Sequence, residues 1–218
     1  MPRISLIHAV HVAIEPVVET FLSDWPEAEV YSLLEDSLSS DLQTAGEIDS
    51  TMIGRFKRLA DYAVDTGADG ILFTCSAFGT AIEAATAAHT SLPILKPNEA
   101  MFEEAIGMGD RIGMITTFQP SIPSMTREFE EMAAAACSSA RLETAFAPNA
   151  MASLSDGDAE THNQLVADAA EQFAETDVLL LAQFSTAQAR LAVEEKYDKP
   201  VLTSPGSAVR KLRRLLNG

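Results

Sequence analysis

One cysteine stands where it could do chemistry. Cys75 follows a short apolar run in GADGILFTCSAFGTA (residues 67–81), and small residues come directly after it. The run is typical of a buried strand, and the residues after it are typical of the start of a helix. A thiolate at a helix N-terminus is stabilised there, and it can accept or give a proton or attack a carbonyl. A free cysteine can equally be a small buried apolar residue, and position alone leaves the two interpretations about even.

Groups that could hold a substrate follow several of the predicted strands. The candidates are Ser76, Ala77, Thr116, Thr117, Ser185 and Thr186. In open α/β sheets ligands bind beyond the carboxyl ends of the strands, so we expect these residues to bind a small anionic substrate. Serine and threonine at these places also cap helices, and capping does not exclude binding.

His8 ends the first predicted strand and is a second candidate for acid–base work. Histidine titrates near neutral pH, so His8 could partner the Cys75 thiolate or act as an acid on the opposite face of a substrate. It could also be a hydrogen-bonded histidine beside the first helix. A metal site at His8 and His11 would need a third ligand that the sequence does not fix, so no metal is expected.

The elements that position these residues repeat along the chain. RISLIH near the N-terminus matches RIGMIT, and ADGILFTCSAFGTA matches TDVLLLAQFSTAQA, both at an offset of 108 residues. LPILKP matches KPVLTSP at an offset of 107. We therefore predict two similar three-layer α/β/α halves with mainly parallel sheets, related by a pseudo-two-fold axis, with the active-site cleft between them. The predicted boundaries are 1–97 and 98–205, with a helix at 206–218 that packs back on the first half.

Composition narrows the class of protein. The 218 residues carry a formal net charge of −17, so nucleic acid and anionic membranes are poor partners. No apolar run is long enough to span a membrane, and the first residues lack the pattern of a signal peptide. Two cysteines, Cys75 and Cys137, are too few for a disulfide framework. We expect a reduced, cytoplasmic protein.

These features resemble the aspartate/glutamate/hydantoin racemase superfamily. The resemblance rests on the duplicated halves, the strand that ends in Thr74-Cys75-Ser76 and the matching strand of the second half. It implies an isomerase of amino acid metabolism that needs no cofactor and is usually a homodimer. It also implies two facing cysteines: one removes the α-proton of a small carboxylate, and the other reprotonates the opposite face. Backbone amides and hydroxyls beside the cysteines would hold the carboxylate.

The chain departs from this family pattern at the second cysteine. The residue 108 positions after Cys75 is Gln183, which has no acid–base capacity near neutral pH. Cys137 lies at the end of an alanine-rich helical run and does not replace it. We expect a racemase- or isomerase-type enzyme in which Cys75 transfers the proton, Gln183 donates a hydrogen bond to an enediolate-like oxygen and His8 supplies the second acid–base group. The alternatives are a one-cysteine decarboxylase or lyase acting on a malonate-like acid, and a non-catalytic protein that binds small carboxylates.

Overall fold

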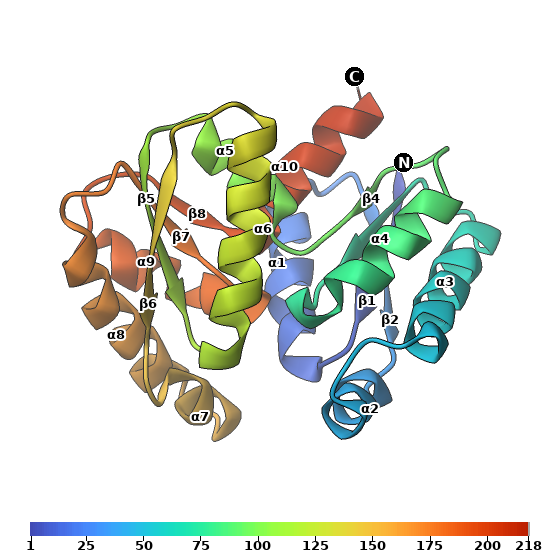
Figure 1. Cartoon of the computed structure of the whole chain (residues 1–218), viewed down its shortest axis with the longest axis horizontal. Coiled ribbons are helices and arrows are strands. Elements are labelled where there is room, and N and C mark those ends of the chain that lie inside the picture. The colour runs from blue at the N-terminus through green and yellow to red at the C-terminus, as the bar shows by residue number, and fades with distance from the viewer. Residues whose placement is uncertain (218) are drawn as a thin grey trace. The chain divides into compact units, whose positions relative to one another are not determined.

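The computed structural model describes residues 1–217, which divide into two compact units (Figure 1). The first unit comprises Met1–Pro97 and the residues from Ala208 onward, and the second comprises Asn98–Ser207. Each unit contains one four-stranded sheet, and every strand pair in both sheets is parallel. The predicted α/β class with parallel sheets is confirmed.

The two sheets have the same strand order. The first is ordered β2-β1-β3-β4 and comprises β1 (Arg3–His8), β2 (Glu29–Leu34), β3 (Gly70–Phe73) and β4 (Ile94–Leu95). The second is ordered β6-β5-β7-β8 and comprises β5 (Arg111–Thr116), β6 (Arg141–Phe146), β7 (Val178–Leu181) and β8 (Val201–Thr203). The register of the strand pairs repeats as well. Ile4 of β1 lies opposite Gly70 of β3, and the matching residues of the second unit, Ile112 of β5 and Val178 of β7, also lie opposite each other.

Helices cover both faces of the first sheet. On one face α2 (Ser37–Ala45), α3 (Ser50–Asp65) and α4 (Gly79–Ala88) share an apolar core with Ile7 and Phe73. On the other face α10 (Ser204–Asn217) contacts the sheet, and a Cβ on Gly70 would lie 3.2 Å from the Leu212 side chain. Alternate strand residues therefore point into different cores, which is why these strands are apolar throughout. The remaining long helix of this unit is α1 (Ile14–Asp24).

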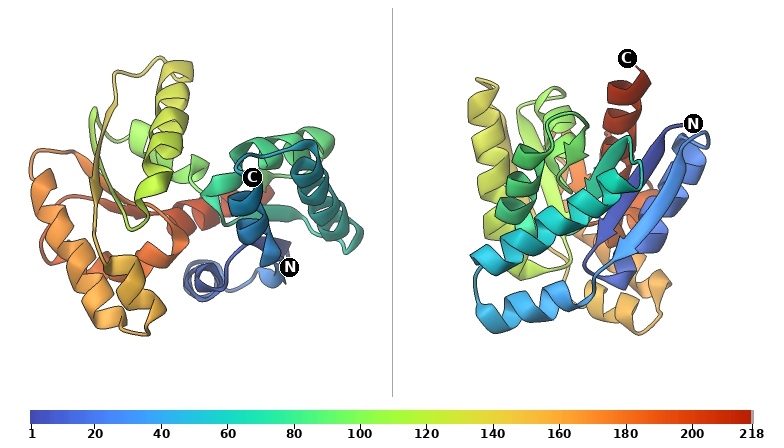
Figure 2. Two further views of the ribbon diagram at one scale, coloured as in Figure 1. Left: turned by 60° about the horizontal axis from the view of Figure 1, so that its bottom comes forward. Right: turned by 90° about the vertical axis from the view of Figure 1, so that its right-hand side faces the viewer.

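The second sheet is covered in the same way. The helices α5 (Glu99–Ile106) and α6 (Ile122–Ala135) pack on one face with Met114 and Leu180. The other face is covered by α7 (Ala150–Ser155), α8 (Ala159–Ala170) and α9 (Arg190–Glu194). Figure 1 and the left view of Figure 2 show α6 and α8 on opposite sides of this sheet.

The start and end of α3 follow signals in the sequence. Its N-cap is Asp49, whose side chain accepts a hydrogen bond of 2.7 Å from the backbone N–H of Met52. The helix ends before Gly67, which has a φ of +83° and stands at the position where glycine is favoured. No helix within residues 1–217 combines the length and the apolar character needed to cross a lipid bilayer.

Candidate active site

Two loops lie side by side at the carboxyl edge of the first sheet. β1 and β3 are neighbours, with Ile7 opposite Phe73, so the segments that follow them leave the sheet together. The backbone N–H of Thr74 donates to the Ile7 carbonyl at 3.0 Å and extends this pairing by one residue. The parallel register therefore brings His8 and Thr74 together, although they are 66 residues apart in the chain.

Cys75 is the half-buried residue at which the second of these loops turns into a helix. It precedes a short 3₁₀ turn (Ser76–Phe78) that continues into α4. Burial raises the pKa of the Cys75 thiol, and a hydrogen bond from the Ala77 backbone N–H only partly opposes this rise. The expectation that the helix start would favour the thiolate is corrected, because burial outweighs it. At neutral pH Cys75 is a protonated thiol.

His8 is fully buried, and both of its ring nitrogens have partners. Nδ1 lies 2.9 Å from Thr74 Oγ1, and Nε2 lies 3.1 Å from Ser32 Oγ. Burial lowers the pKa of His8 to about 4, so the ring is neutral at physiological pH. The expectation that His8 supplies a second acid–base group is not favoured, because neither nitrogen is free to exchange a proton with a substrate.

A narrow recess lies between His8 and Cys75. Its lining residues are Ile7, His8, Ala9, Leu38, Phe56, Phe73 and Cys75. The recess has no room for a water molecule, so it is closed to a ligand in this structure. Sequence reasoning missed Leu38 of α2, which lines the recess, and Ser32 of β2, which is a hydrogen-bond partner of His8. Ser32 interrupts an apolar strand, and that was the available signal.

The matching loop of the second unit is built around Gln183. Its Oε1 accepts hydrogen bonds from the Thr117 backbone N–H at 2.9 Å and from Thr117 Oγ1 at 3.0 Å. Its Nε2 donates to Thr116 Oγ1 at 2.6 Å and to Ser121 Oγ at 3.2 Å. Both N–H bonds of the amide are thus used inside the unit. The expected hydrogen bond from Gln183 to an enediolate-like oxygen would require one of them to break.

The other predicted residues fall into two groups. Thr116, Thr117 and Thr186 are tied to Gln183 or to the backbone, with Thr186 Oγ1 donating to the Ala182 carbonyl at 2.6 Å. Ser76 and Ser185 differ, because their hydroxyls bond to no other side chain or backbone group within residues 1–217. Ala77 is exposed and offers only its backbone. The hydroxyl of Ser76 therefore lies next to Cys75 in the chain, and that of Ser185 lies two positions after Gln183.

Neither unit contains an evident metal centre. Within residues 1–217, no three His, Cys, Asp or Glu side chains are grouped so that they could hold a metal ion. His11 is largely exposed and lies 3.6 Å from Asp36, as a surface pair. The groups that the structure gathers at the carboxyl edge of the first sheet are one thiol, a neighbouring hydroxyl and backbone N–H groups.

Comparison with known proteins places this geometry in context. The family model described as Asp/Glu/Hydantoin racemase matches residues 37–144, which confirms the resemblance found in the sequence. No curated protein sequence gives a significant match.

The solved structures that resemble this chain share its fold. Allantoin racemase from Klebsiella pneumoniae matches with a TM-score of 0.74 and 16% identity over 100% of this chain and 88% of that one. Picrophilus torridus aspartate racemase matches with a TM-score of 0.71 and 13% identity over 100% and 95%. Arylmalonate decarboxylase matches with a TM-score of 0.68 and 16% identity over 100% and 93%. At these identities the likeness is one of fold.

Proposed function

We propose that this chain, which resembles the Asp/Glu/hydantoin racemase family, is a racemase- or isomerase-type enzyme. In this proposal it needs no cofactor, and Cys75 transfers a proton at the α-carbon of a small carboxylate such as an amino acid or a derivative. The observation that carries the proposal is the position of Cys75, half-buried at the carboxyl edge of a parallel sheet. This edge is where open α/β sheets bind ligands. The family match supports a racemase-type activity.

The substrate carboxylate would be held by neutral donors. The Ser76 hydroxyl and backbone N–H groups at the start of the turn after Cys75 suit an anion. Ser185 in the second unit keeps a free hydroxyl in the corresponding loop, and we assign it to substrate binding too. Thr116, Thr117 and Thr186 would contribute by fixing that loop through Gln183.

A second candidate is a one-cysteine decarboxylase or lyase acting on a malonate-like acid. The observation that favours it is the raised pKa of Cys75, because a protonated thiol is a better proton donor than acceptor. In this reaction the bond to one carboxylate breaks and carbon dioxide leaves. The electron pair left on the α-carbon then takes the proton from Sγ, and water returns a proton to the thiolate. Only one acid–base group is needed.

The test is proton NMR in D₂O with amino acids, hydantoins and substituted malonates. We expect deuterium to enter the α-position with wild-type protein and with Cys137→Ser, and to be absent with Cys75→Ala. Loss of carbon dioxide together with deuterium incorporation would select the decarboxylase. Exchange that persists in Cys75→Ala would contradict both candidates. Ligand binding without exchange, unchanged in Cys75→Ala, would identify a non-catalytic binding protein.

A further inference from the structure

The helix α2 is anchored to the core of its unit by Leu38 and, less deeply, by Leu42. Leu38 is fully buried, and the other eight residues of α2 are at least partly exposed. Figure 1 and the right view of Figure 2 show α2 beyond the end of β1 and β2 that is opposite the N-terminus, which is their carboxyl end. Leu38 also lines the recess beside Cys75. The position of α2 therefore sets the size of that recess.

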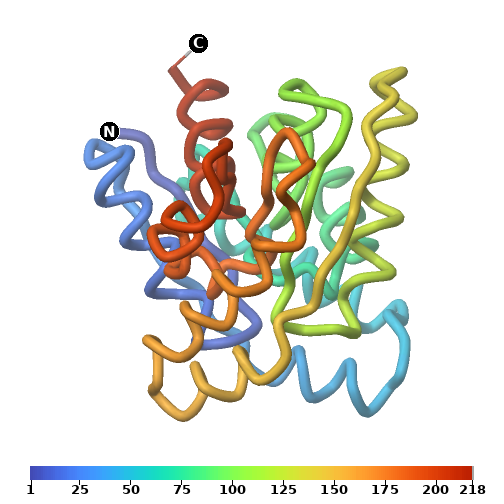
Figure 3. The backbone as a smooth tube through the Cα atoms, turned by 90° about the vertical axis from the view of Figure 1, so that its left-hand side faces the viewer, coloured from blue at the N-terminus to red at the C-terminus, as the bar shows by residue number. Residues whose placement is uncertain are grey.

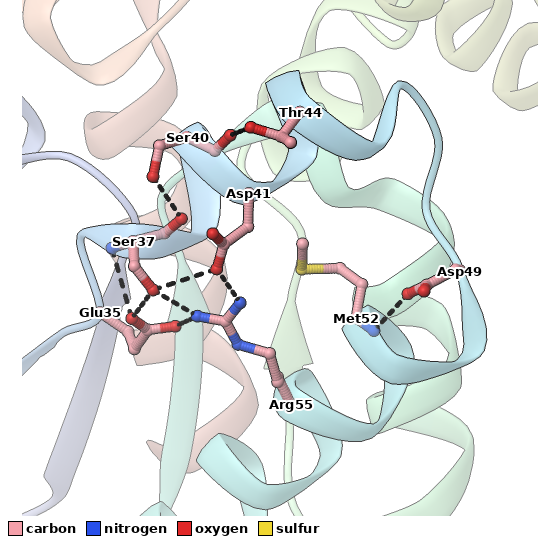
Figure 4. A network of polar contacts seen from close by, with 8 residues as sticks. All are labelled: Glu35, Ser37, Ser40, Asp41, Thr44, Asp49, Met52 and Arg55. Carbon is pink, nitrogen blue, oxygen red and sulfur yellow. Dashed lines mark hydrogen bonds and ion pairs between the residues drawn. The ribbon is translucent and has the colours of Figure 1, made fainter.

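A network of polar contacts holds α2 in place, with Arg55 of α3 at its centre (Figure 4). Arg55 Nη1 donates to Asp41 Oδ2 at 2.5 Å, Nη2 donates to Ser37 Oγ at 2.6 Å, and Nη2 also pairs with Glu35. The Ser37 hydroxyl in turn donates to Glu35 Oε1 at 2.6 Å. One guanidinium thus joins the end of β2, the first turn of α2 and α3. We call Glu35, Ser37, Asp41 and Arg55 the Arg55 network.

The Arg55 network is shielded from water enough for its ion pair to stabilise the position of α2. The Arg55 side chain is 21% exposed and that of Glu35 is 31% exposed, so their pair is partly withdrawn from water. Charge-assisted hydrogen bonds in such a setting are stronger than those of a fully exposed surface pair. A further polar tie from α2 is the Ser39 hydroxyl, which donates to the Ala9 carbonyl at 3.2 Å. Ala9 also lines the recess.

We propose that Arg55 is a positioning residue that holds α2 against the recess and so limits the size of the group that can reach the Cys75 thiol. The inference rests on the proposed role of Cys75. When the Arg55 network is released, α2 is free to carry Leu38 outward and the recess opens. The walls then uncovered are Ile7, Phe56 and Phe73. They are apolar, so the space suits an uncharged, apolar substituent of the substrate.

The experiment measures alkylation of Cys75 in a Cys137→Ser background, which removes the exposed second thiol. Rate constants are compared for iodoacetamide, which is small, and N-phenylmaleimide, which is bulky and apolar. We expect Arg55→Met to raise the N-phenylmaleimide rate about tenfold and the iodoacetamide rate less, because local opening favours the larger reagent. Arg55→Lys should give an intermediate rate, since an ammonium cannot engage Glu35 and Asp41 in the same forked geometry.

Arg58→Met is the matched control, because Arg58 lies on the same helix, is exposed and is not among the hydrogen-bond or ion-pair partners of the Arg55 network in the described part of the chain. Its rates should stay within about twofold of wild type, the range of a neutral surface change. A pH profile gives a second readout: because burial raises the pKa of the Cys75 thiol, opening should move the midpoint of the profile to lower pH as well as raise the rate, and a rise in rate at an unchanged midpoint would speak against opening of the recess. Should Arg55→Met fail to fold, Asp41→Asn, which leaves the pair with Glu35 intact, should show the same effect at smaller size.

Two results would overturn the inference: unchanged rates in both Arg55→Met and Asp41→Asn, or an equal rise in Arg58→Met. Because alkylation needs no turnover, its outcome is independent of the deuterium-exchange test. If Cys75→Ala kept full exchange activity while Arg55→Met still raised alkylation, α2 would be held as proposed and the catalytic role of Cys75 would be wrong.

Discussion

Cys75 and Gln183 stand at matching positions of the two units and differ in backbone as well as in side chain. Cys75 has an ordinary extended φ of −122°, whereas Gln183 has a φ of +74°, which favours glycine. Such a conformation costs roughly 1–3 kcal/mol in a residue with a side chain. The hydrogen bonds of the Gln183 amide to Thr116, Thr117 and Ser121 offset that cost. Gln183 is therefore a structural tie of its loop.

Two substitutions at position 183 separate the backbone strain from the hydrogen bonds. Gln183→Ala keeps the strained φ and leaves the Thr117 N–H without its partner, so we expect the free energy of unfolding to fall by about 2–3 kcal/mol. Gln183→Gly loses the same bonds but relieves the strain, so it should be about 1 kcal/mol more stable than Gln183→Ala. Urea unfolding at neutral pH measures both. Equal stability of the two variants would show that φ at this position is not strained.

The buried neutral His8 makes stability depend on pH. Its pKa is about 4 in the folded protein, whereas an unfolded histidine titrates near 6.5. Below pH 6.5 the unfolded chain gains a proton that folded His8 does not accept, so stability falls as the pH falls. The loss due to His8 should be roughly 2 kcal/mol between pH 7 and pH 5. His8→Asn should lose correspondingly less over this range in urea unfolding, and parallel curves for the two proteins would contradict the argument.

At the scale of the elements, the sequence predicts best where side chains are buried on a regular period. β1 and β5 span the predicted RISLIH and RIGMIT segments. β6 was not predicted, because it is an edge strand with Arg141 and Glu143 exposed, and little of its apolar alternation remains. The helix α2 was not predicted either, since its two core-facing leucines, Leu38 and Leu42, are too few in nine residues to give a clear period.

The partners of the site residues are harder to predict than the residues themselves. Cys75 could be singled out from the sequence because a strand signal and a helix signal meet there. The bonds from His8 to Thr74 and from Gln183 to Thr117 join residues 66 positions apart, and they depend on the register of neighbouring parallel strands. No local pattern carries that register. For the same reason, the sequence could not predict the burial that raises the pKa of the Cys75 thiol.

One strand position tests how tightly an element is packed. A Cβ added to Gly113 of β5 would lie 2.7 Å from the Phe173 ring and 2.9 Å from the Leu179 side chain. We expect Gly113→Ala to lower the free energy of unfolding by about 1–3 kcal/mol, because the core must shift to accept it. The control is Gly54→Ala in α3, where the new Cβ would lie 3.4 Å from Arg58 and helix propensity should add up to about 1 kcal/mol. Stability is measured by thermal and urea unfolding. A Gly113→Ala protein as stable as wild type would contradict the prediction and show that the core relaxes around the new Cβ.

At the scale of the whole molecule, the repeat keeps its architecture and changes its chemistry. Both units have the same strand order. The pairing of β1 with β3 in the first unit and that of β5 with β7 in the second have the same register. The first unit carries a thiol where the second carries an amide that is fully engaged by its neighbours. Duplication thus explains the common framework, and the difference between positions 75 and 183 explains why we propose proton transfer by a single residue.

The helix α10 belongs to both units, since it begins in the second and its residues from Ala208 onward complete the first (Figure 3). The first unit is thus made from two separate stretches of chain, whereas the second is one continuous stretch. During synthesis the strands of the first unit leave the ribosome early. The sheet face at Gly70 stays uncovered until Leu212, near the end of the chain, has been synthesised. The second unit can bury its core meanwhile, because domains generally fold as they emerge. The part of the protein that is translated first is therefore the part that is completed last.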